Sequence, residues 1–402
     1  MKRVVITGIG MISPGGLDLP SSWQAVRDAH AVLALASAGR DIHTRNQLVA
    51  ELKNYDPAAH FDRKQVAALD PVAQYAILAA RQAMARSGLD LQAISPDRTR
   101  CIIGSGTGGE YTHDEASRQV YDQGATRLHP LTVPRIMMSA VASQVALDLR
   151  IMGGVYAISS ACASAAHAIG QAYTDIRSGA ADVAVAGGSE ACLTHGCIKA
   201  WQALHVLSDD CCRPFSHGRR GLVLSEGAAM FVLEDHDAAQ ARGADILAEL
   251  LGFGMSSDAA SLTAPDAAGM ARAMRSALAS ARLPADAIDH VNAHGTGTAA
   301  NDSTECAALA MVFGSRLATM PVTANKSTLG HSLGASGALE LAMAVMTLQT
   351  QTIPPTANFL AEDRDCPIDC VPNVARNAAV RTILSNSFAF GGLNAALVVQ
   401  RA

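Results

Sequence analysis

Cys162 lies in a setting that suits a nucleophilic thiol. An apolar run, residues 155–158, leads into a turn of small residues, 159–161, that ends at the cysteine. The small-residue segment that follows predicts a helix, and the unpaired N–H groups and positive dipole at a helix start favour a thiolate. The alternative is a buried structural cysteine, the commoner role of a lone Cys. His167 faces a different way from Cys162 and is interpreted as structural.

His294 ends a second apolar strand and opens a loop of glycine and threonine. The glycines of this loop, residues 294–298, would let the backbone approach a ligand closely. The hydroxyls of Thr296 and Thr298 could hydrogen-bond a polar arm of that ligand. Alternatively, the segment is a capped loop with a solvated histidine.

Lys326 and His331 share a stretch of small residues that runs into an apolar helix carrying Glu340. Ionisable side chains are costly to bury unless they are paired. The three groups are therefore expected to contact partners, either in a reactive centre or as a structural ion pair.

Phe388 and Phe390 bracket Ala389 just before a glycine pair at residues 391–392. Two aromatic rings beside an approachable backbone indicate a hydrophobic gate. Core packing before the last strand is the alternative.

The elements that would position these residues alternate between strands and helices. Continuous apolar runs predict strands covered on both faces at residues 3–8, 101–104, 155–158, 183–186, 230–233, 290–292 and 395–399. Amphipathic patterns predict helices over residues 70–87 and 266–283. This alternation predicts an α/β fold, and we expect two halves, residues 1–244 and 245–402.

The composition excludes several classes of protein. The chain has 402 residues, a formal net charge of -5, 49% hydrophobic residues and 17% charged residues. A disordered chain would be richer in charge, and no overall positive charge would attract nucleic acid. No run approaches the roughly 20 apolar residues that span a bilayer, and glycines interrupt the apolar start, which argues against a signal peptide. The nine cysteines are odd in number and scattered, so free thiols in a reducing cytoplasm are expected.

Two apparent binding motifs lack their required context. Residues 104–109 match the dinucleotide pattern G-x-G-x-x-G, but the region about 20 positions further on holds no acidic residue. The pairs Cys211/Cys212 and Cys366/Cys370 lack the partner spacing of a zinc site, so no metal is expected.

Four motifs are more specific together than any one of them alone. They are Ser-Ser-Ala-Cys at 159–162, Asn-Ala-His-Gly-Thr-Gly-Thr at 292–298, Asn-Lys-Ser-x-x-Gly-His at 325–331 and Ser-Asn-Ser-Phe-x-Phe-Gly-Gly at 385–392. In this order they resemble the β-ketoacyl-acyl-carrier-protein synthases of the elongating, Cys-His-His type, and further similar segments at 3–10, 213–215 and 225–228 extend the resemblance over essentially the whole chain. The resemblance implies a thiolase-like fold of two similar halves in five layers, α-β-α-β-α. It also implies a decarboxylative Claisen condensation of an enzyme-bound acyl thioester with malonyl-acyl-carrier protein.

The resemblance implies a role for each reactive residue. Cys162 would take the acyl group from a carrier-protein thioester, and His294 and His331 would promote the decarboxylation of malonyl-carrier protein. Lys326 would tune the two histidines electrostatically, and Glu340 would support them.

The same resemblance assigns the surroundings of the nucleophile. Its own backbone N–H and that of Phe390 would form an oxyanion hole, and Phe390 with Phe388 would gate the acyl pocket. Thr296 and Thr298 would bind the phosphopantetheine arm, and Thr107 would lie near the acyl pocket.

The implied partner is an acyl-carrier protein that brings its substrates on phosphopantetheine, with no separate cofactor. Because such a carrier is expected to be acidic, a local basic patch is needed, with Arg63, Lys64 and Arg213 as candidates and Arg219 and Arg220 beside them. The resemblance also implies a dimer, either of two copies or of this chain with a homologous chain-length factor.

Three positions depart from the family pattern. Ala389 replaces the usual Gly between the phenylalanines, Leu393 replaces a Thr, and Arg220 replaces an Asp. The Cβ of Ala389 would restrict a loop that should swing. Since nodulation-type and other specialised-pathway members also carry substitutions here, we expect fatty-acid or polyketide/polyene elongation in a specialised pathway.

Other functions of related proteins stay open. A thiolase would need a second reactive cysteine near the C-terminus, where this chain has residues 390–392, and a starter-type synthase would show a His and Asn pair. A non-catalytic or chain-length-determining subunit would lack the nucleophile, whereas Cys162 is present.

Overall fold

The computed structural model describes residues 1–35 and 47–402, and within them one long sheet of ten strands dominates. The strands are β1 (Val4–Ile12), β4 (Thr99–Gly104), β5 (Gly154–Ile158), β6 (Val183–Glu190), β8 (Gly227–Asp235), β9 (Ala248–Ser257), β10 (His290–Asn292), β11 (Val322–Thr323), β14 (Thr382–Ala389) and β15 (Leu393–Gln400). Two small sheets are formed by β2 (Ala34–Leu35), β3 (Leu48–Ala50) and β7 (Leu224–Ser225), and by β12 (Thr352–Ile353) and β13 (Arg376–Asn377).

The long sheet is an internal duplication. One half runs β1-β8-β6-β4-β5 and the other β9-β15-β14-β10-β11, so the strands of each half are arranged in the same sequence order. In each half three antiparallel strands are followed by two that add in parallel. The halves meet where β1 pairs with β9, from Val4 opposite Leu250 to Ile6 opposite Ala248. The prediction of two similar α/β halves is confirmed, and the boundary after residue 244 stays a prediction.

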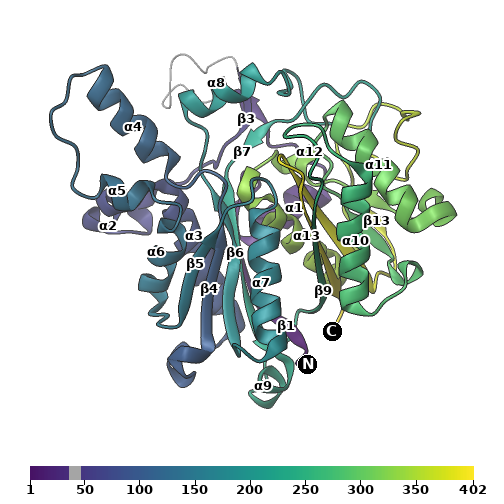
Figure 1. Ribbon diagram of the computed structural model, residues 1–402, viewed down its shortest axis with the longest axis horizontal. Coiled ribbons are helices and arrows are strands. Elements are labelled where there is room, and N and C mark those ends of the chain that lie inside the picture. The colour runs from purple at the N-terminus through teal and green to yellow at the C-terminus, as the bar shows by residue number, and fades with distance from the viewer. Residues whose placement is uncertain (36–46) are drawn as a thin grey trace.

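The two halves of the long sheet form two layers, and helices lie outside and between them in three more, which gives five layers in all (Figure 1). The outer face of the first half is covered by α3 (Pro71–Ser87) and α6 (Ala140–Leu149), and that of the second by α10 (Ala267–Ala281) and α11 (Ala299–Phe313). Between the halves lie α7 (Ser164–Ser178) and α13 (Ser336–Thr350), each packed against strands of both. The remaining α-helices are α1 (Leu19–Arg27), α2 (Arg63–Ala68), α4 (Glu110–Tyr121), α5 (Thr132–Ile136), α8 (His195–Ala203), α9 (His236–Ala241) and α12 (Lys326–Leu329).

Local sequence signals account for the elements that were predicted. Asp70 caps α3 by accepting from the backbone N–H of Val72, and Gly88 ends that helix with a φ of 61°. All seven predicted strands are present. Three strands of the second half were not predicted. Burial alternates along β9, buried serine and asparagine interrupt the apolar run of β14, and β11 has only two residues.

Small residues let the two central helices approach each other. A Cβ added at Gly337 of α13 would meet Ala166 of α7 at 3.1 Å. Both helices are lined with buried alanines at this contact, so neither can be displaced without disturbing the core. The starts of α7 and α13 are thereby held side by side, and the reactive residues lie around them.

Candidate active site

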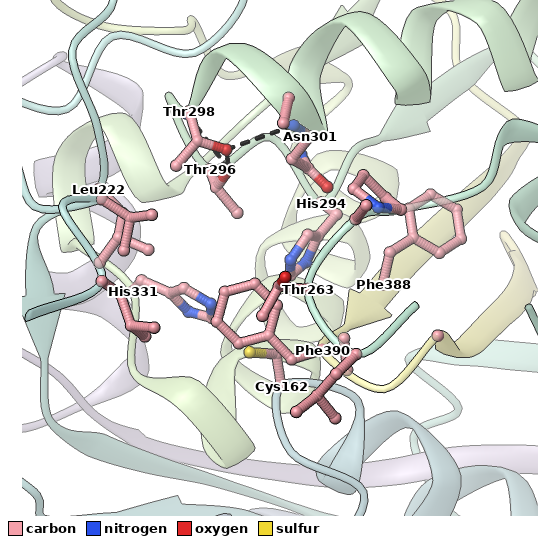
Figure 2. Close-up of a pocket in the computed structure, with 18 of the residues that line it drawn as sticks. Cys162, Leu222, Thr263, His294, Thr296, Thr298, Asn301, His331, Phe388 and Phe390 are labelled. Carbon is pink, nitrogen blue, oxygen red and sulfur yellow. Dashed lines mark hydrogen bonds between the residues drawn. The ribbon is translucent and has the colours of Figure 1, made fainter. Parts of the chain in front are cut away.

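A cavity of about 320 Å³ lies beside the starts of the two central helices. Residues of both halves line it, among them Cys162, Trp201, Leu222, Asp258, Thr263, Met270, His294, Thr296, Thr298, Asn301, His331, Phe388, Phe390 and Asn394. Figure 2 shows the sulfur of Cys162 and the rings of His294 and His331 facing the same space. Four segments that are far apart in the sequence are therefore brought to one place.

Cys162 lies in the turn between β5 and α7, directly before the N-cap residue of that helix. The preceding residue, Ala161, has a φ of 49°, a left-handed conformation that is strained in a residue other than glycine. Burial raises the pKa of the thiol to about 12, while Lys326 and the backbone N–H groups of Cys162 and Phe390 oppose the shift. The helix start thus lies where it was predicted, but burial outweighs it and the resting sulfur is a thiol rather than the expected thiolate.

Two carboxylates of α11 hold the backbone of the loop that begins at His294. Glu305 accepts hydrogen bonds from the N–H groups of His294 and Gly295, each at 2.9 Å, and Asp302 accepts one from Thr296 at 3.0 Å. Both carboxyl groups are fully buried, and burial raises the pKa of each. Sequence analysis assigned them no role, although two acidic residues three positions apart at the start of the next helix were a usable signal.

Lys326 contacts His294, and its ammonium group is buried. It donates to Nδ1 of His294 at 3.2 Å, to the carbonyl oxygen of His294 at 2.6 Å and to the carboxylate of Glu340. Because an ammonium group only donates, Nδ1 of His294 must accept and the ring proton resides on Nε2. Burial raises the pKa of Glu340 to about 7, although Lys326 opposes the shift.

His331 is fixed through its backbone and its ring. Its N–H donates to the carbonyl of Val223 at 2.7 Å, and its carbonyl accepts from the N–H of Ser225 at 3.0 Å. Nδ1 of the ring is 2.8 Å from the hydroxyl of Ser336 at the start of α13. The ring centroids of His331 and His294 are 5.4 Å apart, with 83° between the planes.

Both imidazoles are neutral in this environment. Burial lowers the pKa of His294 and of His331 well below the ordinary value, and the charge of Lys326 lowers both further. Nδ1 of His294 accepts from Lys326, so its Nε2–H remains for the cavity. His331 offers a second Nε2–H when the hydroxyl of Ser336 donates to its Nδ1. Two such donors beside one point can stabilise an oxygen that becomes negatively charged there.

The two phenylalanines of the gate motif occupy different places. Phe388 is 4% exposed, and its ring centroid lies 6.2 Å from that of His294. Phe390 is half-buried and stacks on Trp201, with 5.7 Å between the ring centroids and 18° between the planes. Sequence analysis missed Trp201, because nothing local links residue 201 with residue 390.

The three departures from the family pattern have different surroundings. The positive φ values of the gate loop fall at Gly391 and Gly392, 82° and 67°, and not at Ala389, so the backbone accommodates alanine there. Leu393 begins β15 and lies opposite Ser257 of β9. Arg220 is on the surface, with its side chain 65% exposed.

The predicted ligand-binding threonines divide into two groups. Thr296 and Thr298 line the cavity with their hydroxyl oxygens 2.8 Å apart, and Thr298 also caps α11 by accepting from the N–H of Asn301 (Figure 2). Thr107 does not belong to the lining that the described residues form. Its hydroxyl donates to Glu190 at 2.7 Å.

The predicted basic patch is also divided. Arg63 and Lys64 are exposed on α2. The side chain of Arg213 is only 13% exposed and donates to Asp210 at 2.8 Å, and Arg219 is more deeply buried. Two of the five candidates are therefore largely buried and paired with acidic side chains, so their charge is less available at the surface.

Two structural findings concern metals and membranes. Within residues 1–35 and 47–402, no three His, Cys, Asp or Glu side chains come together in a way that could hold a metal ion. Among the helices of the same stretches, none combines the length and the apolar character needed to cross a membrane.

Two family descriptions match the chain. The "Beta-ketoacyl synthase, N-terminal domain" matches residues 1–239, and the "Beta-ketoacyl synthase, C-terminal domain" matches residues 247–360. Nodulation protein E of Rhizobium sp. (strain N33) is 44% identical, with 100% of this chain and 99% of that protein covered. The 3-oxoacyl-[acyl-carrier-protein] synthase 2 of Staphylococcus aureus (strain COL) is 37% identical, with 100% and 98% covered.

Solved structures match along the same length. The ishigamide ketosynthase/chain length factor superposes with a TM-score of 0.94 and 35% identity, over 100% of this chain and 99% of that chain. A type II polyketide synthase acyl-carrier protein in complex with its ketosynthase, bound to the hexaketide, includes a chain with a TM-score of 0.91 and 28% identity, over 100% and 99%.

Proposed function

The chain belongs to the β-ketoacyl synthase family, and we propose that Cys162, His294 and His331 are the groups with which it catalyses the reaction of that family. It is an acyltransferase that condenses an acyl thioester with malonyl-acyl-carrier protein in fatty-acid or type II polyketide chain elongation. The fold is thiolase-like. The substrates are carried on phosphopantetheine, and no separate cofactor is needed.

Acylation begins when the sulfur of Cys162 attacks the carbonyl carbon of the acyl thioester. The carbonyl oxygen takes up negative charge, and the backbone N–H groups of Cys162 and Phe390, which both act to lower the pKa of the thiol, donate to this oxygen. Collapse of this intermediate expels the sulfur of the carrier arm, which leaves with the proton that the Cys162 thiol gives up. The acyl group then remains on Cys162 while the second carrier protein arrives.

Decarboxylation of the malonyl group supplies the carbon nucleophile without a strong base. The electrons of the breaking carbon–carbon bond stay on the substrate, so the products are CO2 and an enolate. In this proposal the hydroxyl of Ser336 donates to Nδ1 of His331, as Lys326 donates to Nδ1 of His294. Both neutral rings then present Nε2–H to the enolate oxygen. Lys326 and Glu340 support this step by fixing the tautomer of His294.

Condensation follows when the enolate carbon attacks the thioester carbonyl on Cys162. The new carbon–carbon bond forms, the thioester bond breaks, and the Cys162 sulfur leaves as a thiolate that takes a proton from solvent. The β-ketoacyl product is then bound to the second carrier protein. The hydroxyls of Thr296 and Thr298 contact the phosphopantetheine arm at the cavity wall during both half-reactions.

The acyl-carrier protein docks near α2. Arg63 and Lys64 are exposed there and offer positive charge to an acidic partner, whereas Arg213 is paired with Asp210. Surface charge of this kind acts mainly on the association rate and weakens as salt is added.

A second chain pairs along β5, which forms one edge of the long sheet. An exposed edge strand is a template for pairing, and exposed apolar side chains surround it, including Tyr156 on the strand and Leu147 and Met152 beside it. We take a second copy of this chain as the partner, and a homologous chain-length factor is the alternative that co-purification tests. All nine cysteines are free thiols, which suits the cytoplasm.

The convergence of one sulfur and two neutral imidazoles on one cavity supports this proposal most strongly. Its test is the intact mass of the protein after incubation with a panel of acyl-carrier proteins that bear acyl chains of different length. The wild type should gain the mass of the acyl group, Cys162→Ala should gain none, and His294→Ala should still be acylated. Acylation of Cys162→Ala would show that another residue is the nucleophile.

A further inference from the structure

Trp201 and Phe390 form an aromatic stack at the wall of the cavity. Their ring centroids lie 5.7 Å apart, with 18° between the planes. Both residues line the same cavity as Cys162, and both are half-buried. Trp201 comes from α8 in the first half of the chain, and Phe390 from the turn between β14 and β15 in the second. The stack therefore joins the two halves across the site.

Trp201 and Phe390 are each positioned by the element that carries them. The hydroxyl of Thr194 caps the first turn of α8, and Ile198 of that helix is 1% exposed, so the element that carries Trp201 is anchored in the core. No described residue forms a hydrogen bond with the indole N–H, so packing alone holds the indole. The backbone N–H of Phe390 opposes the rise in the pKa of the Cys162 thiol, and both residues line the cavity, so Phe390 lies beside the nucleophile.

We propose that Trp201 is a positioning residue for the gate: its indole holds the ring of Phe390 across the approach to Cys162, and an acyl chain separates the two rings as it is loaded. The inference rests on the proposed function, since acylation of Cys162 is the event that opens the stack. A stacked aromatic pair favours the closed arrangement by about two- to tenfold over the same site without the second ring. Trp201 thus sets how readily an acyl chain enters.

The chain offers a direct probe, because it contains only two tryptophans, Trp23 and Trp201. Trp23 is 5% exposed on α1 and does not line the cavity, so Trp23→Phe leaves Trp201 as the sole indole. During incubation of that variant with an acyl-carrier protein, the indole emission should change in step with the acyl mass on Cys162. Acyl mass without any change in emission would overturn the proposal and leave the proposed function intact. If no acyl mass appeared, the proposed function itself would fail, and this inference with it.

Acylation rates give the second test. Trp201→Leu should accelerate acylation of Cys162 by about two- to tenfold, and Trp201→Phe should stay close to the wild-type rate because a ring can still stack. Lys199→Ala, an exposed change on the same helix, is the matched control for helix stability and should leave the rate unchanged. Equal rates for the wild type, Trp201→Leu and Trp201→Phe would overturn the positioning role. So would an equal effect of Lys199→Ala and Trp201→Leu.

Discussion

Replacing Lys326 with methionine removes one charge from the centre of the site while keeping most of the side-chain volume. The ammonium group is buried, with the side chain 1% exposed, and it donates to Nδ1 and the carbonyl oxygen of His294 and to the carboxylate of Glu340. Lys326→Met therefore leaves Glu340 without its ionic partner and frees Nδ1 of His294.

The first expected effect is on stability. Removing one partner of a buried ion pair costs about 3–5 kcal/mol when the other partner stays charged. Glu340 can instead take up a proton, because burial already raises its pKa to about 7 against the pull of Lys326, and the variant raises that pKa further. A carboxyl group whose folded pKa lies above its unfolded value loses stability as pH rises. The loss caused by Lys326→Met should therefore be largest at about pH 8 and smallest at about pH 5.

The second expected effect is on decarboxylation. Without the ammonium donor, Nδ1 of His294 can carry the ring proton, so Nε2–H is no longer assured for the enolate oxygen. Loss of one oxyanion donor lowers kcat by about 10²–10³-fold. Lys326 also lowers the pKa of His294, so in Lys326→Met that pKa rises and the imidazole becomes charged at a higher pH. The acid limb of the rate profile should move to higher pH.

The assay is release of CO2 from malonyl-carrier protein by acylated enzyme, between about pH 5 and about pH 8, beside denaturant unfolding at the same pH values. The control is Lys326→Met combined with Glu340→Gln, which should regain stability but not decarboxylation. If Lys326→Met alone released CO2 at the wild-type rate and with the wild-type dependence on acidic pH, the role given to Lys326 would be refuted.

Three further predictions concern the supporting structure. Burial raises the pKa of Glu305 from 4.5 to about 7. As pH rises through this range, the unfolding free energy of the wild type should therefore fall by up to about 3 kcal/mol relative to that of Glu305→Gln. A difference in unfolding free energy that does not vary with pH would contradict this. Ala389→Gly should destabilise the protein by about 0.5–1 kcal/mol and increase the acylation rate, because glycine lets the gate loop move more freely. An unchanged rate in an intact-mass time course would show that the Cβ of Ala389 does not restrict the loop. Tyr156→Lys should shift the proposed dimer toward monomer in sedimentation, since the change puts a charge on the exposed edge strand β5. The same sedimentation for wild type and variant would contradict an interface along β5.

Local sequence patterns predicted much of the fold. The strands and helices that were predicted have continuous apolar runs, regular amphipathic spacing or capping residues, such as Asp70 at the start of α3. The strand β9 was not predicted because its inward and outward residues alternate around glycines. The strand β14 was not predicted because Ser385, Asn386 and Ser387 are buried within it. Ser385 and Asn386 form hydrogen bonds with residues of distant segments.

Some features of the site could be predicted from local sequence, and others depend on contacts between distant segments. Residue types identified Cys162 and the histidines as reactive, and the cost of burying Lys326 correctly implied a partner. Which nitrogen of His294 carries the proton follows only from a contact between residues on different elements. The state of the Cys162 thiol depends on a balance between the helix start and burial, and only the folded surroundings decide that balance. The stack of Trp201 on Phe390 likewise has no local signature.

The most direct measurement is CO2 release from malonyl-carrier protein by enzyme that already bears an acyl group, with wild type, His294→Ala and His331→Ala compared at equal acyl loading. Two donors to one enolate oxygen predict that either substitution leaves the acyl mass in place and lowers CO2 release by at least about 10²-fold. CO2 release at the wild-type rate from either acylated variant would contradict the shared role of the two imidazoles.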